Sequence, residues 1–245
     1  MNPTDFPTIL LLFDIDGTLI STDGRAKDAM LAAAEVEFHR PIRFHFKDFA
    51  GSTDRRIIRT LMEKSGIRMD NGEAAIDRIL HRYLEFLAEK LTSPDSVRVY
   101  PGVRELLERL HRDEQFALGL LTGNVEKGAR LKLAPPRLNR YFPIGAFGCD
   151  EEDRTRLPAI AIRRAEAHYR RRFSPERVWI IGDTPRDIRC GKVNHLRTLA
   201  VATGGWTLEQ LQAYHPDVVV PDFQNVEQIV TLLKEGSHSG RDGKR

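Results

Sequence analysis

The chain has 245 residues, of which 41% are hydrophobic and 30% are charged. This mixture is typical of globular proteins and excludes a fibrous or wholly disordered chain, and the length is sufficient for a core without disulfide or metal staples. The 38 basic and 35 acidic residues leave a formal charge of +3, which is too small to indicate binding to nucleic acid or to a membrane.

The cysteine content and the first apolar run of the chain indicate in which cellular compartment the protein is expected. Only Cys149 and Cys190 are present, so a disulfide scaffold is not expected, and no Cys/His spacing indicates zinc. The apolar run over residues 9–13 is too short for a signal peptide or a transmembrane helix. We therefore expect a cytoplasmic protein without a membrane partner.

In chain order, five short apolar runs closed by turn residues predict buried strands. They lie at residues 8–13, 116–121, 178–181, 198–201 and 218–220. Apolar residues at helical spacing predict helices between or after them, at residues 102–112, 126–133, 158–169, 185–193, 208–214 and 225–234. This alternation predicts an α/β fold, a doubly wound, Rossmann-like parallel sheet with helices on both faces.

Residues 25–91 break this alternation, because they are rich in helix formers and contain no convincing buried strand. Helices are predicted at residues 26–38, 54–65 and 74–90, while the alternating residues 44–49 are interpreted as a loop in preference to a short strand. We therefore expect an α-helical insert over residues 21–95, within a core formed by residues 1–20 and 96–235. The polar, glycine-rich tail at residues 236–245 is expected to be disordered.

Two carboxylates, Asp14 and Asp16, follow the first predicted strand, and Gly17 allows a tight turn beside them. In open α/β sheets, ligands bind beyond the carboxyl ends of the strands. Carboxylates this close need a cation or a shared proton, and one can be a nucleophile while the other is a general acid and base. A plain β-turn is the alternative interpretation, since aspartate and glycine are common in turns.

Two further predicted strands end in polar residues. Thr122, Gly123 and Asn124 follow the strand at 116–121 and offer hydrogen-bond donors for an oxyanion, although Thr122 or Asn124 can equally cap the next helix. Asp183 and Asp187 follow the strand at 178–181, where the alternative role is to complement a helix dipole. Three such strand ends favour a shared site, and oxygen ligands without histidine or cysteine favour Mg²⁺.

These motifs resemble those of the haloacid dehalogenase superfamily of phosphohydrolases. The segments DIDGT at residues 14–18, TGN at residues 122–124 and GDTPRD at residues 182–187 match the family in order, spacing and placement at strand ends. The resemblance spans residues 8–220, and the helical insert looks like the cap domain of the family. The nearest subgroup resembles the phosphoglycolate phosphatases, with weaker support from residues 51–54 and 204–206.

The resemblance implies a role for each aspartate of the motifs. Asp14 is expected to attack the phosphorus of a phosphate monoester and form an aspartyl-phosphate. Asp16 is expected to protonate the leaving oxygen and then to activate water. Mg²⁺ is expected on the Asp14 carboxylate, the Asp16 backbone carbonyl and Asp183, with Asp187 either as a further direct ligand or one step behind the ligands.

The resemblance also implies which residues bind the substrate, a small phosphorylated metabolite. Those expected to hold phosphate oxygens are Thr122, Gly123 through its N–H, and Asn124. Those expected to select the substrate from the insert are Gly51, Thr53 and Asp54. The family usually adds a lysine, which is missing here, so Arg154 or Arg156 must replace it, and we favour Arg154. An arginine would bind the phosphate bidentately, where a lysine acts as a point charge.

Two other functions remain open. A sugar-phosphate mutase similar to β-phosphoglucomutase keeps the same aspartates, and its product, an isomer in place of free phosphate, distinguishes it. A non-catalytic protein associated with nucleic acid would use the arginines at residues 163–164 and 170–172. No aromatic side chains interleave with these arginines for stacking, so a solvated helix face is the better interpretation and no nucleic-acid partner is expected. A monomer or a homodimer is expected.

Overall fold

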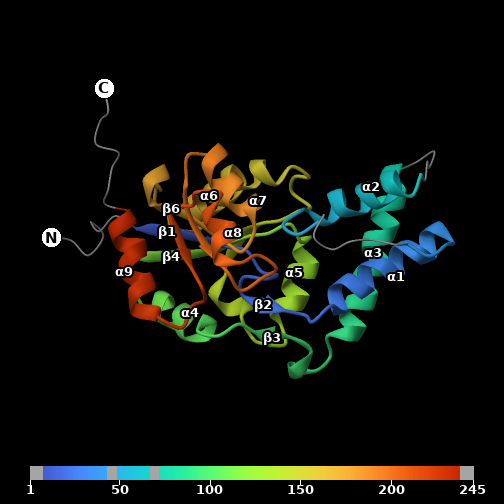
Figure 1. Ribbon diagram of the computed structural model, residues 1–245, viewed down its shortest axis with the longest axis horizontal. Helices are drawn as coiled ribbons and strands as arrows, with labels where there is room; N and C mark the ends of the chain where they lie inside the picture. The colour runs from blue at the N-terminus through green and yellow to red at the C-terminus, as the bar shows by residue number, and fades with distance from the viewer. Residues whose placement is uncertain (1–7, 43–48, 67–71, 238–245) are drawn as a thin grey trace.

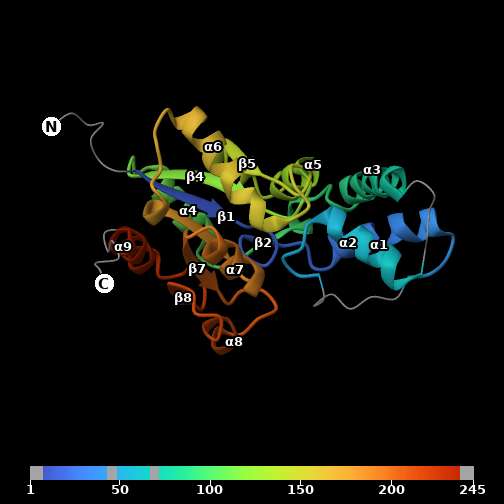
Figure 2. The same ribbon diagram turned by 90° about the horizontal axis from the view of Figure 1, so that it is seen from above.

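The computed structural model describes residues 8–42, 49–66 and 72–237 and divides into two parts (Figure 1). A parallel sheet covered by helices forms the core, and three helices of the insert lie beyond one end of this sheet. The two perpendicular views agree on this arrangement (Figure 2). The predicted α/β fold with a helical insert is therefore confirmed.

The sheet has six parallel strands in the order β5-β4-β1-β6-β7-β8. Five of them were predicted from their apolar runs, and all five are confirmed: β1 (Ile9–Phe13), β4 (Phe116–Leu121), β6 (Val178–Gly182), β7 (Arg197–Val201) and β8 (Val218–Val220). The edge strand β5 (Ile144–Ala146) was not predicted, because it has only three residues and one of them is a glycine. Strand β1 lies between β4 and β6, so the carboxyl ends of these three strands are neighbours.

Both faces of the sheet are covered, which explains why the strands are continuous apolar runs. Leu10 and Leu12 of β1 pack with α6 (Leu157–Tyr169) and α7 (Pro185–Val193). The alternate residues of β1 face a second cluster, to which α4 (Val103–His111), α5 (Glu126–Leu133) and α9 (Val226–Gly236) contribute. Figure 1 shows α6 and α7 above the strands and α4 below them. The short α8 (Leu208–Gln212) packs beside β8.

The insert is built from α1 (Arg25–Phe38), α2 (Asp54–Lys64) and α3 (Gly72–Lys90). Helices α1 and α3 form the most extensive helix–helix contact among the described residues. A small antiparallel ribbon of β2 (Ile20–Ser21) and β3 (Arg98–Val99) joins the insert to the core. Residues 44–49 were predicted to form a loop. Residues 44–48 lie outside the described residues, so this prediction is not tested there. The described residues also form short 3₁₀ turns: η2 (Pro94–Ser96), η3 (Asn139–Tyr141), η4 (Arg154–Arg156) and η5 (Pro175–Arg177).

The C-terminal boundary differs from the prediction that the tail begins at residue 236. Gly236 ends α9, and the Ser237 hydroxyl accepts a hydrogen bond of 2.9 Å from the indole N–H of Trp179. This contact is buried, so the boundary moves by two residues, and residues 238–245 lie outside the described part. In the described segments, every helix is too short or too polar to cross a membrane.

Two glycines that precede helices allow a matched test of backbone strain. Gly102 before α4 and Gly24 before α1 both have left-handed φ values, 78° and 88°. A Cβ on Gly102 would lie 2.1 Å from the backbone of Phe223, whereas a Cβ on Gly24 would have no neighbour within 4 Å. We expect Gly24→Ala to lower the free energy of unfolding by about 1–2 kcal/mol and Gly102→Ala by about 2–5 kcal/mol. Urea unfolding measures both, and equal losses would contradict the backbone contact.

Candidate active site

The three neighbouring strand ends open into one cavity of about 560 Å³. Asp14 follows β1, Thr122 follows β4 and Asp183 follows β6, and all three line this cavity. Its opposite wall is formed by residues of α1, α2 and α3. The sequence motifs therefore converge on one space between the core and the helical insert, as open α/β sheets place their ligands.

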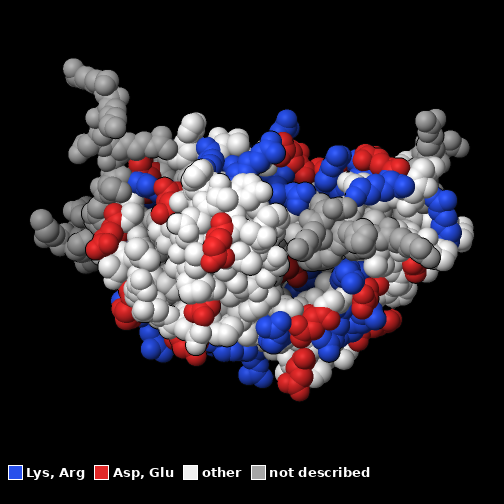
Figure 3. All heavy atoms as spheres, viewed as in Figure 1, with Lys and Arg blue, Asp and Glu red and all other residues white. Residues whose placement is uncertain are grey.

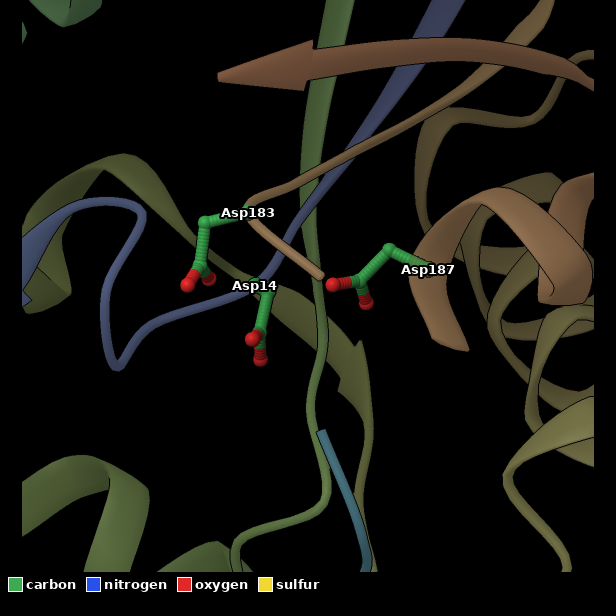
Figure 4. A group of neighbouring side chains, drawn as sticks. All are labelled: Asp14, Asp183 and Asp187. Atoms are coloured by element: carbon green, nitrogen blue, oxygen red, sulfur yellow. The ribbon is translucent and has the colours of Figure 1, made fainter. Parts of the chain in front are cut away.

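Three buried carboxylates, Asp14, Asp183 and Asp187, lie close together at the strand ends, and the first two line the cavity (Figure 4). Carboxylate oxygens of Asp14, Asp183 and Asp187 all lie within 4.8 Å of one another. Burial raises the pKa of Asp14 to about 6, and burial with two neighbouring carboxylates raises the pKa of Asp183 well above its usual value. A cation would relieve both the desolvation and the repulsion. Because the donors are all carboxylate oxygens, the cluster fits a hard cation such as Mg²⁺.

Asp183 has its space because two glycines surround it. A Cβ on Gly17 would lie 2.2 Å from Asp183 Oδ2, and a Cβ on Gly204 would lie 1.8 Å from the same atom. Gly17 also has a φ of 85°, which favours glycine. The other oxygen, Oδ1, accepts a 2.9 Å hydrogen bond from the hydroxyl of Thr18. Any side chain at either glycine would thus displace a carboxylate of the proposed cation site.

Asp187 is held in place from two sides. Its Oδ2 accepts hydrogen bonds from the backbone N–H and the hydroxyl of Thr184, as part of a capping box at the start of α7. Its Oδ1 accepts a 2.6 Å hydrogen bond from Arg154. The helix-capping role that the sequence left as an alternative is therefore present together with the position in the carboxylate cluster.

The structure places Arg154, and not Arg156, beside Asp14. The Arg154 guanidinium is buried, lies 3.2 Å from Asp14 Oδ1, and also donates to the carbonyls of Leu121 and Gly51. Arg156 instead lies 3.6 Å from Glu151, and 70% of its side chain is exposed. The two arginines are separated by one residue in the tight turn η4, so they point in different directions.

Asp16 lines the same cavity, but its carboxylate belongs to a second cluster. Its Oδ2 accepts hydrogen bonds of 2.7 Å from both the Asn124 amide and the Lys132 ammonium. Lys132 also donates to Asn124 Oδ1 at 2.6 Å, and only 5% of its side chain is exposed. Burial alone would lower the pKa of Lys132, but Asp16 and two further acidic groups, Tyr83 and Asp54, raise it above its usual value. The residue is therefore a buried ammonium.

Sequence reasoning missed Lys132, although a signal was present. The buried residues of α5 are Gly128, Ala129, Lys132 and Leu133, so the lysine falls on the apolar stripe of its helix. A lysine at such a position is almost never fully buried unless it is paired. The periodicity of α5 thus indicated a buried partner, but it did not reveal that this partner is Asp16.

The TGN motif at residues 122–124 lines the cavity and also contacts the insert. The hydroxyl oxygen of Thr122 accepts hydrogen bonds from the backbone N–H and the side-chain amide of Asn124, so it orients that residue. A Cβ on Gly123 would lie 2.0 Å from the carbonyl oxygen of Ser52 in the insert. The predicted phosphate-binding residues therefore lie together, directly against the segment that leads into α2.

The three residues predicted to select the substrate tie the insert to the core. Gly51 accepts the hydrogen bond from Arg154 noted above, and Thr53 caps α2 and donates to the carbonyl of Glu152. The Asp54 N–H donates to the carbonyl of Gly123, and its carboxylate accepts from the N–H of Val125 at the start of α5. Gly51 and Asp54 line the cavity, whereas Thr53 does not.

Asp54 gives the chain a testable pH dependence. Burial raises its pKa to about 6, against an ordinary value of 3.8. Between these two values the folded state holds a proton that the unfolded state releases, so this residue makes stability fall as pH rises from about 4 to about 6. Asp54→Asn removes the buried charge and keeps an oxygen for the Val125 N–H. We expect the variant to gain up to about 3 kcal/mol at pH 7.5 and almost nothing at pH 4.

Urea unfolding of both proteins at the two pH values measures this difference. Asp28→Asn is the matched control, because Asp28 lies on α1 with 61% of its side chain exposed. The control is expected to show the same stability difference from the native chain at both pH values. An Asp54→Asn difference that does not change with pH would contradict the raised pKa.

The arginines considered for nucleic-acid binding do not line this cavity. They gather around the end of α6, where Arg164 makes a bidentate pair with Asp150 and Arg172 pairs with Glu166. Their placement adds nothing to the carboxylate cluster, and the expectation about nucleic acid stays a prediction.

Known proteins resemble this chain along most of its length. A family model described as haloacid dehalogenase-like hydrolase matches residues 11–201. A phosphoglycolate phosphatase of Mesorhizobium japonicum is 26% identical over 239 residues, which cover 94% of this chain and 98% of the relative. The pyrophosphatase PpaX of Oceanobacillus iheyensis is 23% identical over 227 residues, which cover 90% of this chain and 95% of that protein.

Solved structures share the fold. The β-phosphoglucomutase of Clostridium difficile has a TM-score of 0.72 at 15% identity, covering 93% of this chain and 98% of its own. A predicted phosphoglycolate phosphatase from Haemophilus somnus 129pt has a TM-score of 0.69 at 17% identity, covering 91% and 98%. At such identities these structures establish the architecture alone.

Proposed function

The chain belongs to the haloacid dehalogenase-like hydrolase family, and from this membership we propose that it is a Mg²⁺-dependent phosphatase acting on a small phosphate monoester. One observation carries the proposal. Asp14, Asp183 and Asp187 form a buried carboxylate cluster at the end of the cavity, with Arg154 beside it and Asp16 on the adjacent wall. Phosphoryl transfer needs mainly positioning and stabilised charge, and these residues supply both.

Asp14 supplies the nucleophile. One of its carboxylate oxygens bonds to phosphorus as the bond from phosphorus to the ester oxygen breaks, which leaves an aspartyl-phosphate. Asp16 gives its proton to the departing oxygen, so the product is a neutral alcohol. In the second half, Asp16 takes a proton from water, the water oxygen attacks phosphorus, and the Asp14 carboxylate and inorganic phosphate are released.

The other residues position charge around the transferred group. Asp14, Asp183 and Asp187 would hold Mg²⁺, together with the backbone carbonyl of Asp16. When bound, the ion supplies Lewis-acid stabilisation of the phosphate oxygens. Residues that would bind those oxygens are Thr122, Gly123 through its N–H, Asn124 and Arg154. Arginine suits this task because its fork can engage two oxygens together.

Release of free phosphate from a panel of monoesters, with Mg²⁺ and with EDTA, tests the proposal. We expect release with Mg²⁺, a loss of at least about a hundredfold with EDTA, and recovery when Mg²⁺ is restored. The panel includes phosphoglycolate, named for one relative, and a hexose phosphate for the mutase alternative. Conversion of the hexose phosphate to an isomer without free phosphate would favour a mutase. Equal release with and without Mg²⁺ would contradict the metal dependence.

A further inference from the structure

The two ends of the cavity differ in chemistry. At the strand ends it is lined by carboxylates, an amide and a guanidinium, as described above. In the helical insert its wall is apolar, formed by side chains from α1, from α2 and from the residue at position 49: Met30, Leu31, Ile57, Leu61 and Phe49. Most of these side chains are buried, and a volume of about 560 Å³ lies within the range of cavities that hold ligands well above the size of a two-carbon acid.

Two of the three described cations that line this cavity have acidic partners within the site. Among the described lining residues the cations are Lys132, Arg154 and Lys27. Lys132 is held by Asp16 and Asn124, and Arg154 by Asp14 and Asp187. Lys27 is 40% exposed and lies 4.0 Å from Asp28. Among the described residues, the insert side of the cavity therefore offers a second anionic group only the exposed Lys27, so such a group would lose hydration for little charge pairing.

Three other described arginines of the insert pair with acidic side chains away from this cavity. Arg55 pairs with Asp77, Arg59 with Glu152, and Arg78 with Glu37. Figure 3 shows charged side chains of both signs intermixed on the face of the insert that this view presents. The apolar side chains of the inner wall line the cavity, so they can contact an apolar group of a bound molecule.

We propose that the substrate is the phosphate monoester of an uncharged, mainly apolar alcohol, whose carbon chain lies against α1 and α2. This inference rests on the proposed phosphatase function and narrows its substrate class. The phosphate meets the carboxylate cluster and Arg154, and the chain fills the apolar end of the same cavity. Burial of apolar surface then adds binding energy with each carbon, whereas a carboxylate at the same place loses hydration.

A series of n-alkyl phosphates from ethyl to hexyl tests the proposal, because the leaving alcohols have nearly the same acidity and differ only in apolar length. We expect kcat/KM to rise about threefold to fourfold per methylene until the cavity is filled. Ethyl phosphate and phosphoglycolate form a second comparison, since a methyl group replaces a carboxylate. We expect ethyl phosphate to be the better substrate.

Two substitutions of the same kind on α1 separate the wall from the rest of the helix. Leu31 is partly buried and lines the cavity, whereas Val36 is 43% exposed and does not. Leu31→Lys is expected to raise kcat/KM for phosphoglycolate relative to hexyl phosphate by tenfold or more. Val36→Lys is expected to leave this ratio unchanged. Circular dichroism and the unfolding midpoint verify that both variants fold.

The possible failures are distinguishable. A flat or falling alkyl series, with phosphoglycolate preferred to ethyl phosphate, would overturn the apolar substrate class and leave the phosphatase standing. An unchanged preference in folded Leu31→Lys would also overturn it. If no ester is cleaved, including p-nitrophenyl phosphate with its reactive leaving group, the phosphatase itself fails and the narrower inference fails with it.

Discussion

Asp14→Asn is expected to reduce phosphate release by roughly 10⁴-fold or more while the protein stays folded. The amide has nearly the shape of the carboxylate but is a very poor nucleophile, so the covalent step is lost. Stability is not expected to fall, because the substitution removes one of three crowded buried carboxylates, and Arg154 keeps its 2.6 Å contact with Asp187. Initial rates on the best ester of the panel and thermal unfolding measure the two effects.

A second readout separates loss of the nucleophile from general damage. Beryllofluoride with Mg²⁺ coordinates a carboxylate oxygen as a phosphoryl group would, and it should raise the unfolding temperature of the native protein but not that of Asp14→Asn. Asp95→Asn, at an exposed position in η2, is the matched control and should behave as the native chain. Full activity in folded Asp14→Asn would remove Asp14 from the mechanism.

Lys132→Met is expected to lower kcat/KM for alkyl phosphates by about a hundredfold. Lys132 does not meet the carboxylate cluster directly. It acts as a positioning residue, because its ammonium and the Asn124 amide both donate to Oδ2 of Asp16. Without the ammonium, Asp16 keeps one of these two donors and loses its only close cation among the described residues. The Asp16 carboxylate is then free to turn away from the position in which it exchanges a proton with the leaving oxygen and with water.

The leaving group makes this prediction specific. p-Nitrophenolate departs without a proton, so kcat/KM for p-nitrophenyl phosphate should fall far less than kcat/KM for an alkyl phosphate. A merely structural loss would lower both values together. Lys127→Met is the control, because Lys127 is exposed on the same helix. Equal losses on the two substrates would exclude the positioning role.

The sequence predicted best those features that depend on local pattern. The strand ends at Asp14, Thr122 and Asp183 followed from apolar runs closed by turn residues, and parallel strands bring their carboxyl ends to one edge. The sequence could not decide between Arg154 and Arg156, because they are two positions apart in one 3₁₀ turn and only tertiary packing determines which points inward.

Contacts between segments that are distant in sequence could not be predicted from local apolar patterns. The pairing of Lys132 with Asp16 joins residues 116 positions apart, and the contact of Asp54 with Val125 joins residues 71 positions apart. The apolar wall was equally hidden, since apolar residues on α1 and α2 are explained by packing within the insert until the cavity between them and the core is seen. Local periodicity shows which side of a helix is buried but not what lies opposite it.

The ribbon of β2 and β3 has a consequence for how this architecture diversifies. The chain leaves the core at Ser21 and returns at Arg98, and these two residues are paired in the ribbon. Because exit and return lie side by side, an insert of another length or shape could replace α1–α3 without reordering the sheet or moving the carboxylates. Recognition of the alcohol and chemistry on the phosphate are thus separable modules, and new substrates can be acquired by exchanging one while the other is kept.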